Sequence, residues 1–334
     1  MMTPNPQLTP STALTPPVRE QPWLLASVLA MARLIPRRCG LAFFRLLGDA
    51  FFLLARERRR IAAINLEIAF GTALSRAEKA RIARACFQNS LALIFDFLKL
   101  PQLPIQQQED CIKIHGEEHL QEAFNLGRGV LAVSAHFGNF PLLLCAMSRR
   151  GYPLYVVTRH FNSTWADDLY TGVLARFGTK TFTKDRVAPN ILKALKGGAI
   201  VGYVLDQNMQ RENGCFVDFF EKKACTIKGM ATLAARYGSP ILPTFIVSTA
   251  DGMHHIHIEK AFIPDDLKTL TKRDLELTQH FTHLIEAWIK IHPEQWLWFH
   301  RRWKTRPEGE APVYPPKKGL RRSIKLIMRR WRSA

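Results

Sequence analysis

The chain has 334 residues, and its 47 lysines and arginines outnumber its 28 aspartates and glutamates, which gives a formal net charge of +19. Hydrophobic residues make up 47% of the chain, which excludes a disordered or collagen-like protein and suffices for one large or two ordinary domains. The positive charge indicates an anionic partner: nucleic acid, an acidic membrane surface, or an acidic carrier or substrate.

The cysteines form no recognisable disulfide or metal motif. The six are Cys39, Cys86, Cys111, Cys145, Cys215 and Cys225. No two have C-x-x-C spacing, most lie in apolar runs, and no His/Cys cluster has the spacing of a zinc site. We therefore expect no bound metal, and reduced, buried thiols in a protein that faces the cytosol.

The chain is expected to begin with a disordered tail over residues 1–21. This stretch is rich in proline, threonine, glutamine and serine and has no apolar periodicity. It has no basic segment leading into an apolar core, so we expect no signal peptide.

Residues 22–56 are expected to form a pair of membrane-associated helices. Arg33 interrupts the first apolar block, and Arg45 and Asp49 lie within the second, so neither reaches the roughly 18–20 uncharged residues of a membrane span. Both blocks are long for surface helices and carry arginines at their ends. Helices that lie in or against the cytoplasmic leaflet account for both features, and two buried core helices are the alternative.

Residues 57–312 are expected to form an α/β domain. Helical spacing runs through residues 57–100, with a capping box at Ser75 and Glu78. Farther along, short apolar runs alternate with amphipathic helical stretches, as buried strands alternate with crossover helices. These runs are residues 129–135, 153–158, 199–205 and 241–248. Residues 254–260 alternate polar and apolar side chains, which is typical of a more exposed edge strand.

Residues 313–334 are expected to form a basic amphipathic helix, because lysines and arginines are interleaved there with apolar residues. In helical form one face carries Leu320, Ile324, Ile327, Met328 and Trp331. Such a helix suits an anionic bilayer surface, and a solvated tail or a nucleic-acid-binding arm is the alternative.

His136 is the sharpest local signal for chemistry. It directly follows a buried strand in SAHFGNFPLL, residues 134–143, and ligands of α/β sheets bind beyond the carboxyl ends of strands. Gly138 would let the backbone approach a ligand closely, and Pro141 suits the first position of a helix. We therefore expect a catalytic histidine, in preference to one satisfied within the core.

Six segments, in order, carry a resemblance to a known family. They are RERRRIAAINLEIAF, SAHFGNF, YVVTRHFNSTWADDL, GYVLDQN, FVDFFEKKACTIKGMATLAARYGSPILPTF and HPEQWLWFHRRWKTRPEG. From about Arg56 to Gly309 the chain resembles the bacterial lipid A biosynthesis acyltransferases, the lauroyl/myristoyl family related to other lysophospholipid acyltransferases. The resemblance implies a glycerolipid-acyltransferase-like α/β fold, with a mixed central sheet flanked by helices.

The signature of that family pairs a histidine with an acid five positions on. His136 fills the first position, but Pro141 stands in the second and can neither orient nor polarise an imidazole. The substituting acid is expected to be Asp206 in YVLDQN or Asp218 in FVDFF, with altered or lost activity as the alternative. A loop or cap contact is the other role open to either aspartate.

By this resemblance the reaction moves a fatty acyl chain from a thioester, on acyl carrier protein or CoA, to a hydroxyl of a lipid A precursor. His136 would act as the general base of a direct transfer, and no other cofactor is expected. Backbone N–H groups near Gly138, or the amide of Asn139, would stabilise the oxyanion. The sequence has no G-x-S-x-G motif and no cysteine with an evident base, which argues against a covalent nucleophile.

Arginines are the expected contacts for the acceptor. Arg159 matches an arginine that the family uses near its acceptor phosphate or sugar, with an ion pair to Asp167 or Asp168 as the alternative. Arg301 and Arg302 lie close to tryptophans in the sequence, which fits a site where lipid headgroups meet the protein. A role for these two in fixing the C-terminal fold is equally open.

Two other functions fit the same residues. An acyltransferase of this fold could use a lysophospholipid, another glycolipid or an ornithine lipid, and a non-enzymatic relative could bind lipid without turnover. Nucleic-acid binding is disfavoured because no zinc-finger, helix-turn-helix or RNP pattern is present. The positive charge then indicates anionic phospholipid, a lipid A precursor and the acidic acyl carrier protein, at the cytoplasmic face of the inner membrane.

Overall fold

The computed structural model describes residues 22–158, 163–182, 187–263 and 270–316. The tail predicted over residues 1–21 and nearly all of the predicted C-terminal helix lie outside these ranges, so both stay predictions.

Helices and strands alternate along most of the described chain. The α-helices are α1 (Pro22–Leu34), α2 (Arg37–Leu54), α3 (Arg56–Phe70), α4 (Arg76–Lys99), α5 (Ile105–Glu109), α6 (Glu117–Asn125), α7 (Phe140–Arg149), α8 (Thr164–Arg176), α9 (Val187–Lys196), α10 (Gly229–Tyr237) and α11 (Leu270–Ile291). The strands are β1 (Ile112–His115), β2 (Val130–Ser134), β3 (Leu154–Val157), β4 (Lys180–Phe182), β5 (Ile200–Val204), β6 (Gly214–Phe219), β7 (Lys222–Ile227), β8 (Ile241–Ser248) and β9 (His254–Ile258).

The central sheet is mixed, as predicted, with the strand order β1-β9-β8-β2-β5-β3-β4. Strands β8, β2, β5, β3 and β4 run parallel to one another, whereas β9 is antiparallel to β8 and parallel to β1. The prediction that the alternating segment is an edge strand is wrong, because the short β1 pairs with β9 and forms the edge. The two remaining strands, β6 and β7, form a separate antiparallel hairpin.

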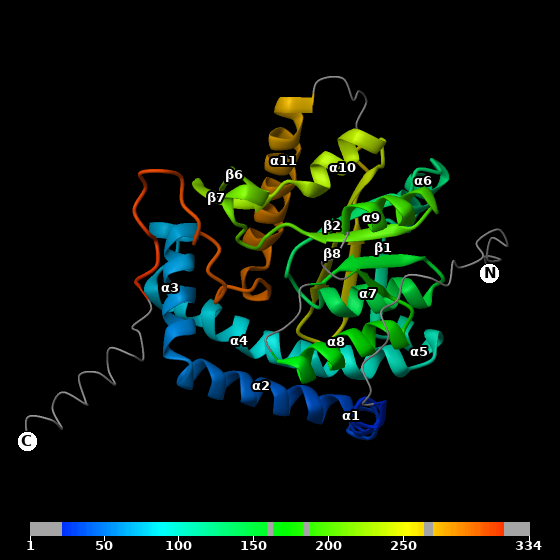
Figure 1. Ribbon diagram of the computed structural model, residues 1–334. Helices are drawn as coiled ribbons and strands as arrows, with labels where there is room; N and C mark the ends of the chain where they lie inside the picture. Colours follow the sequence, from blue (N-terminus) through cyan, green and yellow to red (C-terminus); the bar gives the residue numbers. More distant parts are fainter. Residues whose placement is uncertain (1–21, 159–162, 183–186, 264–269, 317–334) are drawn as a thin grey trace, which may run out of the picture.

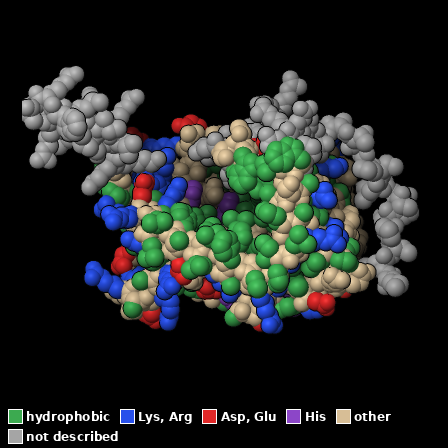
Figure 2. Space-filling model, turned by 90° about the horizontal axis from the view of Figure 1, so that it is seen from below, with side chains coloured by type: hydrophobic (Ala, Val, Ile, Leu, Met, Phe, Trp, Pro, Cys, Tyr) green, Lys and Arg blue, Asp and Glu red, His purple; other side chains and the backbone are tan. Residues whose placement is uncertain are grey.

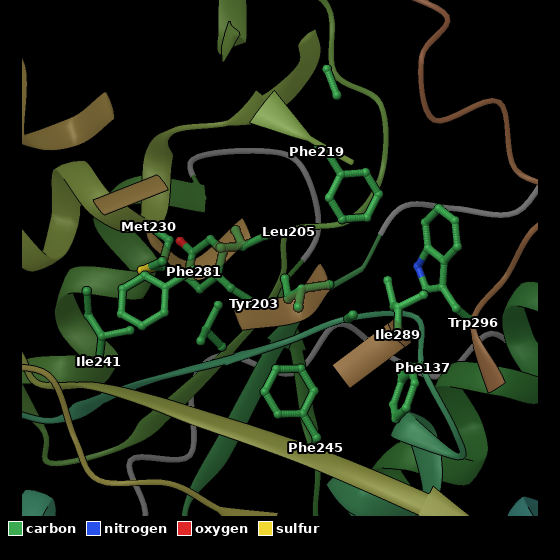
Figure 3. Packing of buried hydrophobic residues seen from close by; sticks show 14 of the residues in the cluster. Phe137, Tyr203, Leu205, Phe219, Met230, Ile241, Phe245, Phe281, Ile289 and Trp296 are labelled. Atoms are coloured by element: carbon green, nitrogen blue, oxygen red, sulfur yellow. The ribbon is translucent and has the colours of Figure 1, made fainter. Parts of the chain in front are cut away.

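Helices cover both faces of the sheet (Figure 1). On one face, side chains of β2, β5 and β8 pack against α3, α9, α10 and α11 and against tryptophans that follow α11. On the other face, alternate residues of the same strands pack against α1, α6, α7 and α8. Figure 3 shows the first of these clusters, where Phe245, Phe281 and Trp296 are each buried to within 1% exposure. Full burial of one such side chain stabilises the fold by about 1.5–3 kcal/mol.

The capping box predicted at the start of α4 is present. The Ser75 hydroxyl accepts a hydrogen bond from the Glu78 N–H at 3.2 Å, and the Ser75 N–H donates to Glu78 Oε2 at 2.8 Å. These two bonds satisfy N–H groups that would otherwise be unpaired at the helix start. The helix passes into a 3₁₀ turn, Leu100–Gln102, which contains Pro101, so its end also lies where proline predicts it.

Helices α1 and α2 pack on one side and are open on the other. Gly40 and Gly48 let α2 lie close along α4, since a Cβ at Gly40 would overlap the Phe95 ring and one at Gly48 would lie 2.5 Å from Gln88 Cα. Large apolar side chains on the outer side are exposed. This apolar face comprises Trp23, Met31, Leu34, Ile35, Phe43, Leu46, Leu47, Leu53 and Leu54.

Figure 2 looks onto the side of the molecule where α1 and α2 lie, and hydrophobic side chains gather there with lysines and arginines around them. The alternative of two fully buried core helices is therefore wrong. Among the described helices, none has the length and apolar character needed to cross a membrane. Association of this pair with a membrane stays a prediction.

Candidate active site

The site forms at the carboxyl ends of two adjacent parallel strands. Ser134, the last residue of β2, pairs with Val204, the last residue of β5. The Leu205 N–H donates to the Ser134 carbonyl at 3.2 Å, which continues the pairing by one step. His136 and Asp206 each follow two residues beyond the end of their strand, so the register brings them side by side at the middle of the sheet.

Asp206 holds the imidazole of His136 through several hydrogen bonds. Its Oδ1 lies 2.9 Å from His136 Nδ1 and accepts the backbone N–H of His136 at 3.0 Å. Its Oδ2 accepts the indole N–H of Trp296 at 2.8 Å. Burial alone would raise the pKa of Asp206, but its interactions with His136 and the indole outweigh that effect and hold the pKa far below its usual range.

This arrangement fixes the tautomer of His136. Because Asp206 is a carboxylate at neutral pH, the atom facing it, Nδ1, carries the ring proton of the neutral imidazole. The lone pair is then on Nε2, where the side-chain amide nitrogen of Gln207 lies at 3.0 Å and donates. The His136 side chain keeps 19% exposure, whereas Asp206 keeps 2%, so the histidine is the member of the pair that a substrate can reach.

Asp206 therefore provides His136 with the carboxylate that the family signature would have placed at residue 141. Pro141 is in the first turn of α7 and supplies no carboxylate. The second candidate, Asp218, is on β6 with its side chain 45% exposed, and its carboxylate accepts from Lys223 at 2.8 Å across the hairpin. The expectation that Asp218 might meet His136 is wrong, because the hairpin places it in a different ion pair.

Gly138 and Asn139 build the turn after His136. Gly138 has φ +52°, a Cβ there would overlap the Ile246 carbonyl, and its N–H donates to the Gln295 carbonyl at 3.0 Å. Asn139 is fully buried and caps α7: its Oδ1 accepts the N–H of Leu142 at 3.3 Å. Its Nδ2 donates to a backbone carbonyl of α4 at 3.0 Å. Internal partners occupy the Gly138 N–H and the Asn139 amide, and contact of these two residues with substrate stays a prediction.

Arg302 is also part of the protein interior. It is fully buried, and burial lowers its pKa to about 10, so it stays charged at neutral pH. Its guanidinium donates to the carbonyls of Gln207 at 3.2 Å and Cys225 at 2.9 Å and to the Thr226 hydroxyl, and it lies over the Phe219 ring. These partners fix the loop that carries Asp206, and the expected contact of Arg302 with substrate stays a prediction.

Arg301 links its own segment to α3 and to Tyr314 near the C-terminal end of the described chain. It pairs with Glu57 at 2.8 Å and lies over the Tyr314 ring. Its side chain keeps 19% exposure. These contacts fit the alternative prediction, in which Arg301 fixes the C-terminal fold. Arg159 lies outside the described residues, so its role near the acceptor stays a prediction.

Three residues of the site were not identified from the sequence. Gln207 follows Asp206 at the same strand end, and that adjacency is a signal that could have found it. Trp296 lies 90 residues from Asp206, and only the fold brings its indole to the carboxylate. A third, His300, lies beside them, with Nε2 accepting the Asn208 N–H at 3.1 Å. Burial lowers the pKa of His300 to about 4, so its ring is neutral at physiological pH.

The cysteines lie elsewhere and are all free. Three are buried, Cys86, Cys145 and Cys225, whereas Cys39 is exposed and the other two are half-buried, so the expectation of buried thiols holds for only part of the set. Burial raises the pKa of the Cys86 thiol to about 12. Within the described ranges, histidines, cysteines and acids form no group of three that could hold a metal ion.

An α/β sheet that presents a histidine–aspartate pair at the end of its central strand has the architecture of an enzyme that works through a histidine base. Over residues 10–305 the chain matches the family model described as bacterial lipid A biosynthesis acyltransferase. The chain belongs to this family of O-acyltransferases, which confirms the resemblance seen in the sequence.

Curated relatives cover most of the chain. The chain is 27% identical to the lipid A biosynthesis lauroyltransferase of Escherichia coli strain K12, over 91% of its own length and 98% of the relative's. It is 26% identical to the palmitoleoyltransferase of the same strain, over 78% and 83% of the two lengths. Among solved structures it is similar to the 1-acyl-sn-glycerophosphate acyltransferase of Thermotoga maritima, at 15% identity and a TM-score of 0.37, over 75% of this chain and 99% of that one.

Proposed function

We propose that this protein transfers a fatty acyl chain from a thioester, on acyl carrier protein or CoA, to a hydroxyl of a lipid A precursor or similar glycolipid at a membrane. The observation that carries the proposal is the contact of His136 Nδ1 with the buried Asp206 carboxylate at 2.9 Å. This contact gives the chain a histidine–carboxylate pair although Pro141 replaces the acid of the family signature. It therefore supports a catalytic role in preference to lipid binding without catalysis.

In the proposed reaction His136 Nε2 accepts the proton of the acceptor hydroxyl while the hydroxyl oxygen bonds to the thioester carbon. The carbonyl oxygen carries the negative charge of the tetrahedral intermediate. When that charge returns to the carbonyl, the C–S bond breaks and the leaving thiolate takes the proton back from Nε2. Asp206 stabilises the imidazolium between the two transfers, and general base catalysis of this kind contributes about 10²–10⁴-fold in rate.

The cysteines support direct transfer without an acyl-enzyme. A thiolate nucleophile needs a lowered pKa, but burial raises the pKa of Cys86, Cys145 and Cys225. The thioester donor then needs no cofactor beyond its own carrier.

Membrane association is proposed from the apolar face of α1 and α2. Exposed leucines and aromatic residues on one side of a helix pair would each gain free energy by leaving water. Helix α3 follows directly and begins with the exposed cations Arg56, Arg58 and Arg60, each worth about 1 kcal/mol beside anionic lipid. Arg58 donates to the Phe299 carbonyl at 3.3 Å, next to His300, which links this basic rim to the active site.

An acyl-transfer assay tests the proposed function. The purified full chain is given an acyl carrier protein or CoA thioester with either a lipid A precursor or lysophospholipids. We expect transfer to the lipid A precursor, a loss of about 10²–10⁴-fold in His136→Ala, and a marked loss in Asp206→Asn, whose amide cannot stabilise the imidazolium.

Asp218→Asn is the matched control, since it removes an aspartate that pairs with Lys223 at the surface, and it should keep wild-type turnover. Circular dichroism shows whether each variant is folded. Near-normal turnover in His136→Ala, or no transfer to any acceptor by the wild type, contradicts the proposal. Transfer to lysophospholipids alone would assign a different acceptor to the same chemistry.

A further inference from the structure

The reaction proposed above needs a donor for the oxyanion, and two of the groups expected to provide it, the Gly138 N–H and the Asn139 amide, are occupied. The Gly138 N–H donates to the Gln295 carbonyl, and the Asn139 amide donates to the Leu93 carbonyl. Loss of a single oxyanion donor typically lowers kcat about 10²–10³-fold, so the role calls for another group near His136 Nε2.

Gln207 is the neutral side-chain donor that lies against the base. Its amide nitrogen is 3.0 Å from His136 Nε2. Because Nδ1 holds the proton shared with Asp206, Nε2 accepts and the amide donates. In the free protein, the Gln207 amide therefore donates a hydrogen bond to the basic nitrogen of His136.

The backbone around Gln207 is fixed on both sides. Arg302 binds the Gln207 carbonyl at 3.2 Å, and the next N–H, of Asn208, donates to His300 at 3.1 Å. The Asn208 side chain is held in turn by Thr305, with its Nδ2 donating at 3.0 Å and its Oδ1 accepting at 2.8 Å. Movement of the amide is thus confined to the torsions of its own side chain.

An acceptor hydroxyl must approach Nε2 to within about 2.6–3.2 Å to give up its proton, and the amide already occupies that distance. The two groups cannot donate to one lone pair together, so the amide turns aside as the hydroxyl binds. With its backbone fixed, it remains beside the oxygen that attacks and thus beside the carbon under attack.

We propose, on the basis of the acyl transfer proposed above, that Gln207 binds the thioester carbonyl oxygen once the acceptor hydroxyl has replaced its amide at His136. The amide N–H donates a hydrogen bond and transfers no proton. The hydroxyl proton goes to Nε2 and leaves on the thiol, so protons and charge balance without Gln207 ionising. A neutral donor suits this position. A cation there would oppose protonation of the imidazole, and an anion would stabilise the imidazolium so that it would no longer act as a base.

Three variants test the assignment in the transfer assay. Gln207→Ala should lower kcat about 10²–10³-fold with only a small change in acceptor KM, because the donor acts on the transition state. Gln207→Glu should move the acid limb of the pH profile to higher pH, since a carboxylate beside Nε2 favours the imidazolium. Gln210→Ala removes an exposed glutamine three residues on and should keep wild-type kcat.

The outcomes separate this inference from the proposed function. One result would overturn this inference and leave the proposed function intact. In that result the wild type transfers acyl groups, His136→Ala does not, and Gln207→Ala has an unchanged or higher kcat, so that Gln207 only covers the base. An NMR titration of the free protein needs no turnover. The His136 midpoint should lie at higher pH in Gln207→Glu than in the wild type, and equal midpoints would overturn the inference whatever the assay shows.

Discussion

At the scale of single residues, the site depends on three buried ionisable groups with different charges. Asp206 is held as a carboxylate, Arg302 stays protonated with a pKa lowered by burial to about 10, and His300 is neutral. The carboxylate and the guanidinium do not pair directly. Arg302 instead binds the carbonyl of Gln207, the residue after Asp206, so it orients the loop and leaves Asp206 to His136.

His300 should make stability depend on pH. Burial lowers its pKa to about 4 in the folded chain, against about 6.5 when unfolded. Between these values the unfolded chain binds more protons, so this contribution is fully present above pH 6.5 and is lost as pH falls toward 4. The loss is at most about 3 kcal/mol, from about 1.4 kcal/mol for each pH unit. Urea unfolding of the wild type and His300→Gln across this range measures it, and parallel curves for the two proteins would contradict it.

The sequence predicts His136 as the base, but it does not show which groups surround the imidazole. His136 was found because it ends a recognisable buried strand. Asp206 and Asp218 were indistinguishable in sequence, since the choice depends on strand order and on the pairing of Asp218 with Lys223. The internal partners of Asn139 and Arg302 could not be predicted, because donors that bind substrates also hold turns together and these partners lie 46 or more residues away.

At the scale of elements, the sequence predicts four strands from apolar runs, β2, β3, β5 and β8, and a fifth, β9, from its alternating pattern. The short β1 and β4 and the hairpin β6–β7 were missed, because strands of three or four residues carry little periodicity and the hairpin strands mix charged and apolar residues. The helix start at Ser75 was found because a capping box is local. The close contact of α2 with α4 is not local, and only the structure shows why α2 has glycines at two positions that face α4.

Gly48→Ala should destabilise the protein. In an ordinary helix interior this change stabilises by about 1 kcal/mol. Here the new Cβ would lie 2.5 Å from Gln88 Cα, so α2 would have to move off α4, and overpacking of this kind costs about 1–3 kcal/mol. Thermal unfolding should show a lower midpoint. Gly229→Ala in α10 is the control, because its Cβ meets nothing within 4 Å and its midpoint should stay or rise. A variant at Gly48 as stable as the wild type would show that α2 is not held this closely.

At the scale of the whole molecule, basic residues surround the apolar face on the same side of the protein. Figure 2 shows hydrophobic side chains in the middle of that side and lysines and arginines around them, with histidine side chains in a hollow at the border. An acyl chain and a phosphorylated lipid would meet these two kinds of surface at once. The +19 charge did not distinguish a membrane from nucleic acid by itself, but its position beside exposed leucines does favour lipid.

This arrangement predicts binding of the full chain to anionic vesicles. Leu46 and Leu54 on α2 are 66% and 81% exposed, and each would contribute up to about 1.5–3 kcal/mol on entering lipid. In sedimentation with phosphatidylglycerol vesicles, Leu46→Asp with Leu54→Asp should reduce the bound fraction strongly, and added salt should reduce it further by screening the basic residues.

Leu275→Asp is the matched control, since Leu275 is an exposed leucine near the start of α11, which lies at the top of Figure 1 whereas α2 lies at the bottom, and it should bind as the wild type does. Neutral phosphatidylcholine vesicles should capture less of every protein, because they lack the charge that attracts the basic rim. Equal sedimentation of the wild type and the α2 double variant would show that the apolar face does not enter the bilayer. Equal binding to neutral and anionic vesicles would show that the basic residues do not contribute to binding and that the apolar contact alone explains it.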